Sequence, residues 1–197
     1  MSTTTTSPLK PEDVYGAFCG PIDENGARDL IAALTVATGK HQNAHLLFQS
    51  SGGTVGEGIC LYNFFRTLPI ELTIYNVGSL GSAAVIAYLG ARRRVASARS
   101  IFMLHRTFTK SGETVPYMII PGITKNLALS DEHTESIMRG HITLPESMNW
   151  ADLDRYDFYF SGAEAVQIGL AHEIGEFAPP AGATVWHFFS EHRDKGK

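Results

Sequence analysis

The 197-residue sequence has few cysteines, no excess of basic charge and no long apolar run. Only Cys19 and Cys60 occur, and their separation does not match the close pairs that bind metal ions. Both lie among apolar residues, so we expect buried thiols and a reducing compartment. We expect no metal and no other cofactor.

The low basic charge and the short apolar runs exclude two further classes of protein. The net charge is −4, and we interpret the basic run at 92–94 as a solvated turn, which argues against a nucleic-acid-binding face. The apolar run Ala83–Ala91 is far shorter than the roughly 20 residues that span a membrane. Residues 1–16 lack the apolar core of a signal peptide. We therefore expect a cytoplasmic protein that binds neither nucleic acid nor a membrane.

The chain is 44% hydrophobic and 18% charged, which suits one domain with a sizeable core. Apolar runs predict strands at 14–20, 45–50, 72–77, 93–96, 100–105 and 170–174. Helices are predicted to start after Asp23 or Asn25, at the Thr54–Glu57 capping box, at Ser82 and at the Ser161–Glu164 capping box. Near-continuous apolar strands between helices predict an α/β fold with a sheet buried on both faces.

Residues 107–150 differ from the rest in being more polar. They contain a predicted helix at about 124–140 whose apolar stripe is thin, so this segment either protrudes or docks on a partner. The polar residues 1–13 are expected to be a flexible N-terminus. The main domain is expected at 14–178, followed by a C-terminal tail at 179–197.

The stretch Gly78–Ala84, GSLGSAA, places Ser82 between an apolar strand and a helix of small residues. A serine at the first turn of a helix lies close to free backbone N–H groups, which can stabilise negative charge on a reacting oxygen. Taken alone, Ser82 is more typical of a helix cap than of a nucleophile. The nucleophile-elbow pattern G-x-S-x-G is absent around Ser79 and Ser82.

Three other places carry residues that could support acyl transfer. The Gly52–Gly53 turn offers backbone N–H groups for an anion, although a plain turn is the simpler interpretation and no lysine follows to make a phosphate loop. His105 closes a buried strand, with Arg106 beside it expected to be solvated. Asp157 stands among aromatic residues, where burial requires a partner.

The chain order Ser82, His105, Asp157 differs from the orders of three familiar triads, but a triad is recognised by geometry rather than by order.

At these residues the sequence resembles the proteolytic subunit of the Clp protease, the ClpP family of serine peptidases. Four segments carry the resemblance: 49–55 is similar to N-S-P-G-G-x-V, 78–84 to G-Q-A-A-S-M-G, 102–105 to a strand ending M-I-H, and 157–165 to D-x-F-x-S-A-x-E-A. The departures are Ser51 for proline, Ala83 for methionine, Ala84 for glycine, and Arg106-Thr107 for Gln-Pro.

The resemblance implies a crotonase-like superfold of repeated ββα units, with residues 107–150 as a protruding handle at a ring-to-ring interface. It implies a serine endopeptidase with the triad Ser82, His105 and Asp157, and with the backbone N–H groups of Gly53 and Ala83 as oxyanion donors. Ser79 is excluded as the nucleophile.

The resemblance further implies heptameric rings, stacked as a tetradecamer, that cleave peptides or unfolded proteins. It also implies a Clp AAA+ ATPase partner, although the short polar stretch before the first strand argues against such docking. Two alternatives stay open. One is a non-catalytic ring subunit, and the other is an acyl-CoA enzyme of the same superfold, which shares the oxyanion hole but does not need the triad.

Overall fold

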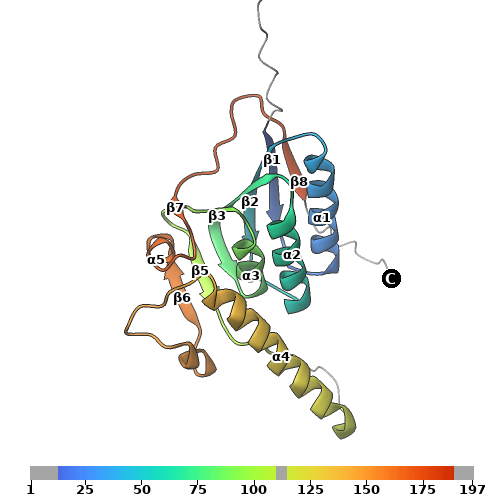
Figure 1. Ribbon diagram of the computed structural model, residues 1–197, viewed down its shortest axis with the longest axis vertical. Helices are drawn as coiled ribbons and strands as arrows, with labels where there is room; N and C mark the ends of the chain where they lie inside the picture. The colour runs from blue at the N-terminus through green and yellow to red at the C-terminus, as the bar shows by residue number, and fades with distance from the viewer. Residues whose placement is uncertain (1–12, 110–114, 189–197) are drawn as a thin grey trace, which may run out of the picture.

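The computed structural model describes residues 13–109 and 115–188, which form a mixed α/β structure around one sheet (Figure 1). The strands are β1 Val14–Cys19, β2 Asn43–Ser50, β3 Glu71–Gly81, β4 Arg93–Ala96, β5 Ile101–Leu104, β6 Phe158–Ser161, β7 Glu173–Ile174 and β8 Val185–Phe188. The helices are α1 Glu24–Thr38, α2 Val55–Thr67, α3 Ala83–Leu89, α4 Ile120–Arg139 and α5 Gly162–Gln167, with short 3-10 helices η1 Tyr117–Ile119 and η2 Trp150–Asp154. The predicted α/β class is confirmed.

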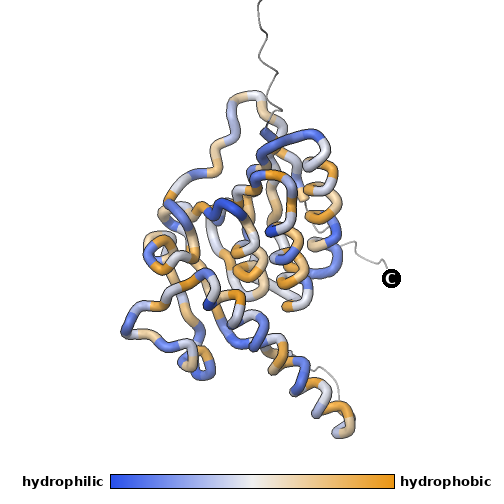
Figure 2. Tube along the Cα trace, in the orientation of Figure 1, coloured by the Kyte–Doolittle hydropathy of each residue, from blue (hydrophilic) through white to orange (hydrophobic). Residues whose placement is uncertain are grey.

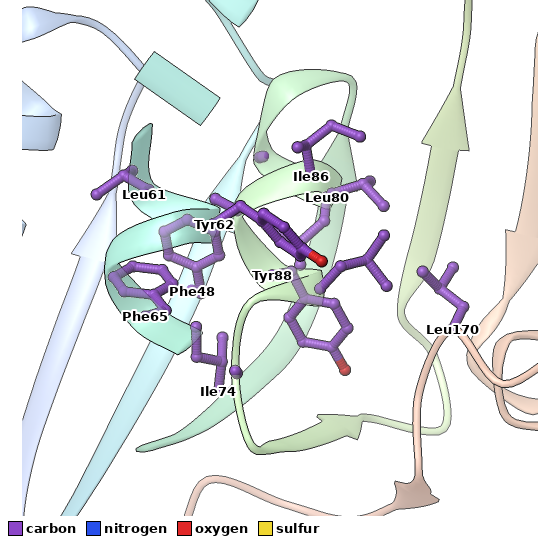
Figure 3. Packing of buried hydrophobic residues seen from close by; sticks show 14 of the residues in the cluster. Phe48, Leu61, Tyr62, Phe65, Ile74, Leu80, Ile86, Tyr88 and Leu170 are labelled. Atoms are coloured by element: carbon purple, nitrogen blue, oxygen red, sulfur yellow. The ribbon is translucent and has the colours of Figure 1, made fainter. Parts of the chain in front are cut away.

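The sheet has the strand order β6-β5-β3-β2-β1-β8, and β4 and β7 branch from β3. Neighbouring strands are parallel except β5 and β6, which are antiparallel. Along β2, buried residues alternate with half-buried ones, so the prediction of a sheet fully buried on both faces is wrong for this strand. The buried face carries Phe48, which joins Leu61 and Phe65 of α2 in the core (Figure 3).

Helix α3 lies inside the molecule, with all seven of its residues buried. Its alanines let it sit close to α2, and its larger side chains, such as Ile86 and Tyr88, fill the core around Leu80 and Leu170 (Figure 3). Helix α3 is therefore held rigidly, and so is the turn at its first residue.

Strand β3 is longer than predicted because it bends and changes partners. Residues 73–76 pair with β4, whereas residues 79–81 pair with β5. At the bend, the buried amide of Asn76 accepts the Gly78 N–H (3.1 Å) and donates to the Ile101 carbonyl (3.0 Å). The Gln49 side chain accepts the Ser79 N–H (2.9 Å). These amides satisfy backbone groups that a regular strand ladder would pair, so the strand continues to Gly81.

The main element of the handle segment is α4, which extends away from the sheet (Figure 1). The predicted thin stripe is confirmed, since only Thr134 and Met138 of this helix are buried. The helix begins four residues earlier than predicted. Residues 110–114 of the handle, 1–12 of the predicted flexible N-terminus and 189–197 of the predicted tail lie outside the described residues.

Several local predictions are confirmed and others are wrong. The basic run at 92–94 is not a solvated turn, because Arg93 and Arg94 lie in β4 and Arg94 is buried. Asp23 caps α1, and the Ser161–Glu164 capping box caps α5. Thr54 precedes α2, but its side chain makes no capping hydrogen bond. Cys19 and Cys60 are exposed rather than buried, because each lies on the outer side of its element.

Strand β6 was not predicted, and neither was strand β8. Strand β8 lies within the stretch expected as a tail and pairs with the free edge of β1. Across residues 13–109 and 115–188, no helix combines the length and apolar character needed to cross a membrane.

Candidate active site

Ser82 occupies the sharp turn that joins β3 to α3. Its backbone has φ 54° and ψ −128°, and it is the one non-glycine residue with positive φ among those described. A side chain in this conformation is strained by about 1–3 kcal/mol, and such strain persists where the surroundings fix it. Here the Ser82 N–H donates to the Met103 carbonyl (2.9 Å) and the Ser82 carbonyl accepts the Val85 N–H (2.9 Å). The Ser82 hydroxyl makes no capping hydrogen bond to α3, so a role as a simple helix cap does not explain this serine.

The Gly52–Gly53 turn packs directly against Ser82. Both glycines have positive φ, at 100° and 155°. A Cβ on Gly52 would lie 2.7 Å from the Ser82 Cβ and 3.2 Å from the Ala83 nitrogen, so only glycine fits this close approach. Within the described residues, neither the Gly53 nor the Ala83 N–H donates a hydrogen bond. Two backbone donors are therefore available near the Ser82 side chain.

The turn itself is held by its neighbours. The Ser50 hydroxyl accepts the Gly52 N–H (3.1 Å), and the Gly52 carbonyl accepts the Ile22 N–H (2.9 Å). The Ile22 carbonyl accepts the Thr54 N–H (2.8 Å). These bonds fix the turn before any ligand arrives, as pre-organised oxyanion donors require.

His105 follows β5 directly and shares a small cavity with Ser82. The cavity has a volume of about 20 Å³, and its other lining residues come from α2, α3, β5 and the handle: Val55, Ala83, Ile86, Leu104, Thr107, Thr134 and Met138. This space suits about one water molecule. The His105 Nδ1 is hydrogen-bonded to the Arg106 carbonyl (2.5 Å), and its ring lies 5.2 Å from that of Phe108.

Asp157 lies next to His105 through the register of β5 and β6. The last antiparallel pair is Leu104 with Phe158, and His105 and Asp157 each lie one residue beyond that pair, outside the ladder. The Asp157 carboxylate, however, is exposed and accepts a long hydrogen bond from the Tyr159 hydroxyl (3.5 Å). The described structure brings Ser82 and His105 together but does not join His105 to Asp157.

Arg106 was expected to be solvated, and that prediction is wrong. Its side chain is only 25% exposed and bonds to Glu135 of α4 and to Asp154 of η2, the latter at 2.7 Å. We call Arg106, Glu135 and Asp154 the Arg106 clamp. The three residues of the clamp lie far apart in the sequence, so no local sequence pattern could have predicted their ion pairs.

The charges of the clamp support one another. Burial favours the neutral form of Glu135, but hydrogen bonds and charges from Arg106 and Arg139 lower its pKa below the usual value. Partial burial also favours the neutral form of Arg106, which by itself lowers its pKa. The hydrogen bonds and charges of Glu135 and Asp154 outweigh burial and raise the pKa of Arg106 above its usual value. Both groups are therefore ionised at neutral pH.

Comparison with known proteins places these features in a family. The family model of the Clp protease matches residues 13–177, a range that includes all the candidate site residues. The fold is similar to that of a ClpP1 variant from Listeria monocytogenes, with a TM-score of 0.66. That likeness covers 84% of this chain and 91% of the other at 19% sequence identity, and it therefore concerns the fold.

Proposed function

The chain belongs to the Clp protease family, and from this premise we propose that it is a serine endopeptidase with Ser82 as its nucleophile. The observation that carries the proposal is the strained backbone of Ser82 at a rigid strand-to-helix turn, beside His105 in one cavity. Strain at a non-glycine residue is uncommon, and it concentrates where function requires it.

In the proposed reaction, the Ser82 hydroxyl attacks a peptide carbonyl while His105 accepts its proton. The oxyanion that forms is stabilised by the N–H groups of Gly53 and Ala83. The C–N bond then breaks, the proton passes from His105 to the leaving amine, and an acyl-enzyme remains on Ser82. Water then attacks the acyl-enzyme, with His105 again accepting the proton, and the carboxylic acid product is released from Ser82. Asp157 is assigned the role of orienting the imidazole and stabilising its cation.

For Asp157 to act in this way, two hydrogen bonds of the described structure must exchange. The His105 Nδ1 has to leave the Arg106 carbonyl, and the Asp157 carboxylate has to turn from Tyr159 toward His105. The strand register supports this exchange, because the β5–β6 ladder ends at Leu104–Phe158 and each of the two residues lies one step beyond it.

The exposed end of the handle supports assembly into rings. Four consecutive apolar residues, the three of η1 and the first of α4, are about half exposed or more: Tyr117 (77%), Met118 (71%), Ile119 (51%) and Ile120 (48%). Figure 2 shows this apolar group at the far end of the helix, away from the core. An exposed apolar cluster of this kind marks an interface. The proposed assembly is a heptameric ring stacked in pairs through the handle, with peptides or unfolded proteins as substrates and a Clp AAA+ ATPase as a further partner.

The bond between His105 and the Arg106 carbonyl favours one second candidate, a ring subunit without activity of its own. In that case the imidazole stays on the carbonyl permanently. The acyl-CoA alternative gains no specific observation from the geometry.

Labelling by a fluorophosphonate, together with cleavage of a small fluorogenic peptide, tests the proposal. Wild type should be labelled and active, and Ser82→Ala should lose both. Ser79→Ala is the matched control and should keep both. Labelling that persists in Ser82→Ala would show that another residue is the nucleophile, and absence of labelling in the wild type would favour the non-catalytic subunit.

A further inference from the structure

The clamp ties the chain immediately after His105 to two elements outside the sheet. Arg106 bonds to α4 through Glu135 and to η2 through Asp154. The next residue is also fixed, since the Thr107 N–H donates to the Asp131 carboxylate (2.7 Å). Asp131 and Glu135 lie one helical turn apart on the same face of α4. Residues 106 and 107 are therefore held against the handle helix at two successive points.

Holding the backbone at these points also fixes the direction of the Arg106 carbonyl, which is the acceptor for the His105 Nδ1. We propose that the Arg106 clamp keeps the His105 imidazole on this carbonyl and away from Asp157, so that Arg106 is a positioning residue that holds the triad open. This inference rests on the proposed function, because it assigns a regulator to the same site.

The held arrangement is the less reactive one. A neutral carbonyl orients the imidazole, but it lacks the negative charge with which a carboxylate stabilises the imidazolium that forms during attack. Release of the clamp allows the imidazole to exchange to the carboxylate of Asp157. Because Glu135 belongs to α4, movement of the handle changes the balance between the two acceptors.

Glu135→Gln tests the clamp, since it removes one charge and keeps the shape of the side chain. The rate of fluorophosphonate labelling at Ser82 should rise about two- to fivefold, the change in population expected from loss of the ion pair with Arg106. The same substitution also removes the ion pair between Glu135 and Arg139 on α4. Asp154→Asn should give a smaller rise in the same direction, because Asp154 is exposed and solvent screens its ion pair with Arg106. Glu71→Gln breaks an exposed ion pair with Arg92 and serves as the matched control, with labelling unchanged.

The gain must depend on Asp157. In the double variant Glu135→Gln/Asp157→Asn, labelling should be no faster than in Asp157→Asn alone. A gain that survives Asp157→Asn would overturn the inference, as would labelling of Glu135→Gln and Asp154→Asn at or below the wild-type rate.

A readout that needs no catalysis separates this inference from the proposed function. In a Ser82→Ala background, the Nδ1–H proton of His105 is followed by NMR. Glu135→Gln should move this resonance downfield, since a carboxylate makes a stronger hydrogen bond than a carbonyl, and Asp157→Asn should reverse the shift. An unchanged resonance refutes the clamp. A shifted resonance without labelling in any protein refutes the peptidase but upholds the clamp.

Discussion

The close packing of Gly52 on Ser82 makes Gly52→Ala a strong test of the site. The new Cβ would lie 2.7 Å from both the Gly81 carbonyl oxygen and the Ser82 Cβ. Carbon atoms in contact are normally about 3.5–4.0 Å apart, so Ser82 or the turn must move by about 1 Å. A displacement of about 1 Å at a catalytic group can slow a reaction roughly 100-fold. We expect fluorophosphonate labelling of Ser82 to slow by about this factor.

The same substitution should lower stability. Alanine at φ 100° is strained by about 1–3 kcal/mol, and overpacking adds a similar amount. The expected total is about 2–6 kcal/mol, or a fall of roughly 4–24 °C in the melting temperature for a domain of this size. Labelling is measured well below the melting temperature of the variant, so that loss of reactivity reports geometry and not unfolding.

Gly56→Ala is the matched control for Gly52→Ala. Gly56 lies in the first turn of α2, and a Cβ there would meet no heavy atom within 4 Å. Labelling should be unchanged, and stability should rise by up to about 1 kcal/mol because alanine favours the helix. If Gly52→Ala were labelled as fast as wild type, the assignment of the Gly52–Gly53 turn to the site would fail.

Three further substitutions test the bend, the core and the handle. Asn76→Leu should reduce the free energy of unfolding in urea by about 2–4 kcal/mol, because the Gly78 N–H and the Ile101 carbonyl lose their partly buried hydrogen bonds; an unchanged midpoint would contradict this account of the bend. Burial, followed by the charges of Arg94, Arg66 and His172, lowers the pKa of His141 from 6.5 to about 4. The unfolded chain therefore binds a proton that the folded chain does not, and stability falls as the pH drops from about 6.5 to about 4. His141→Gln should flatten this fall in denaturation curves, and an unaltered slope would refute it. Tyr117→Ser/Met118→Ser should reduce the mass seen by light scattering without lowering the melting temperature of the subunit, and an unchanged mass would place the interface elsewhere.

The parts of the fold that the sequence predicts are those determined by neighbouring residues. Asp23 and Ser161 cap the helices that follow them, and each cap needs only a side chain and a backbone N–H three residues away. Apolar runs located β1 to β5 and β7 for the same reason. Strands β6 and β8 were missed although Phe158–Ser161 and Val185–Phe188 are rich in aromatic residues, and the edge pairing of β8 with β1 depends on a distant partner.

The length of β3 shows why boundaries are harder to predict than elements. Its continuation to Gly81 requires the Asn76 amide to reach β5 and the Gln49 amide to reach β3 from β2. Neither contact leaves a trace in the local sequence, where the glycines and serines of 78–82 favour a turn. The strained turn was therefore placed correctly at Ser82, but its structural cause was not.

His105 illustrates how a site can combine one local and one distant hydrogen-bond acceptor. The Arg106 carbonyl is the next group along the chain and is available to the imidazole whatever the rest of the protein does. The Asp157 carboxylate is available only where β5 and β6 pair in register. Sequence patterns identify all three residues, but in the proposed clamp the choice between the acceptors depends on the ion pair of Arg106 with Glu135 of a third element, α4. If the clamp acts as proposed, the reactivity of Ser82 is linked to the position of the handle, since that helix carries the charge that holds the local acceptor in place.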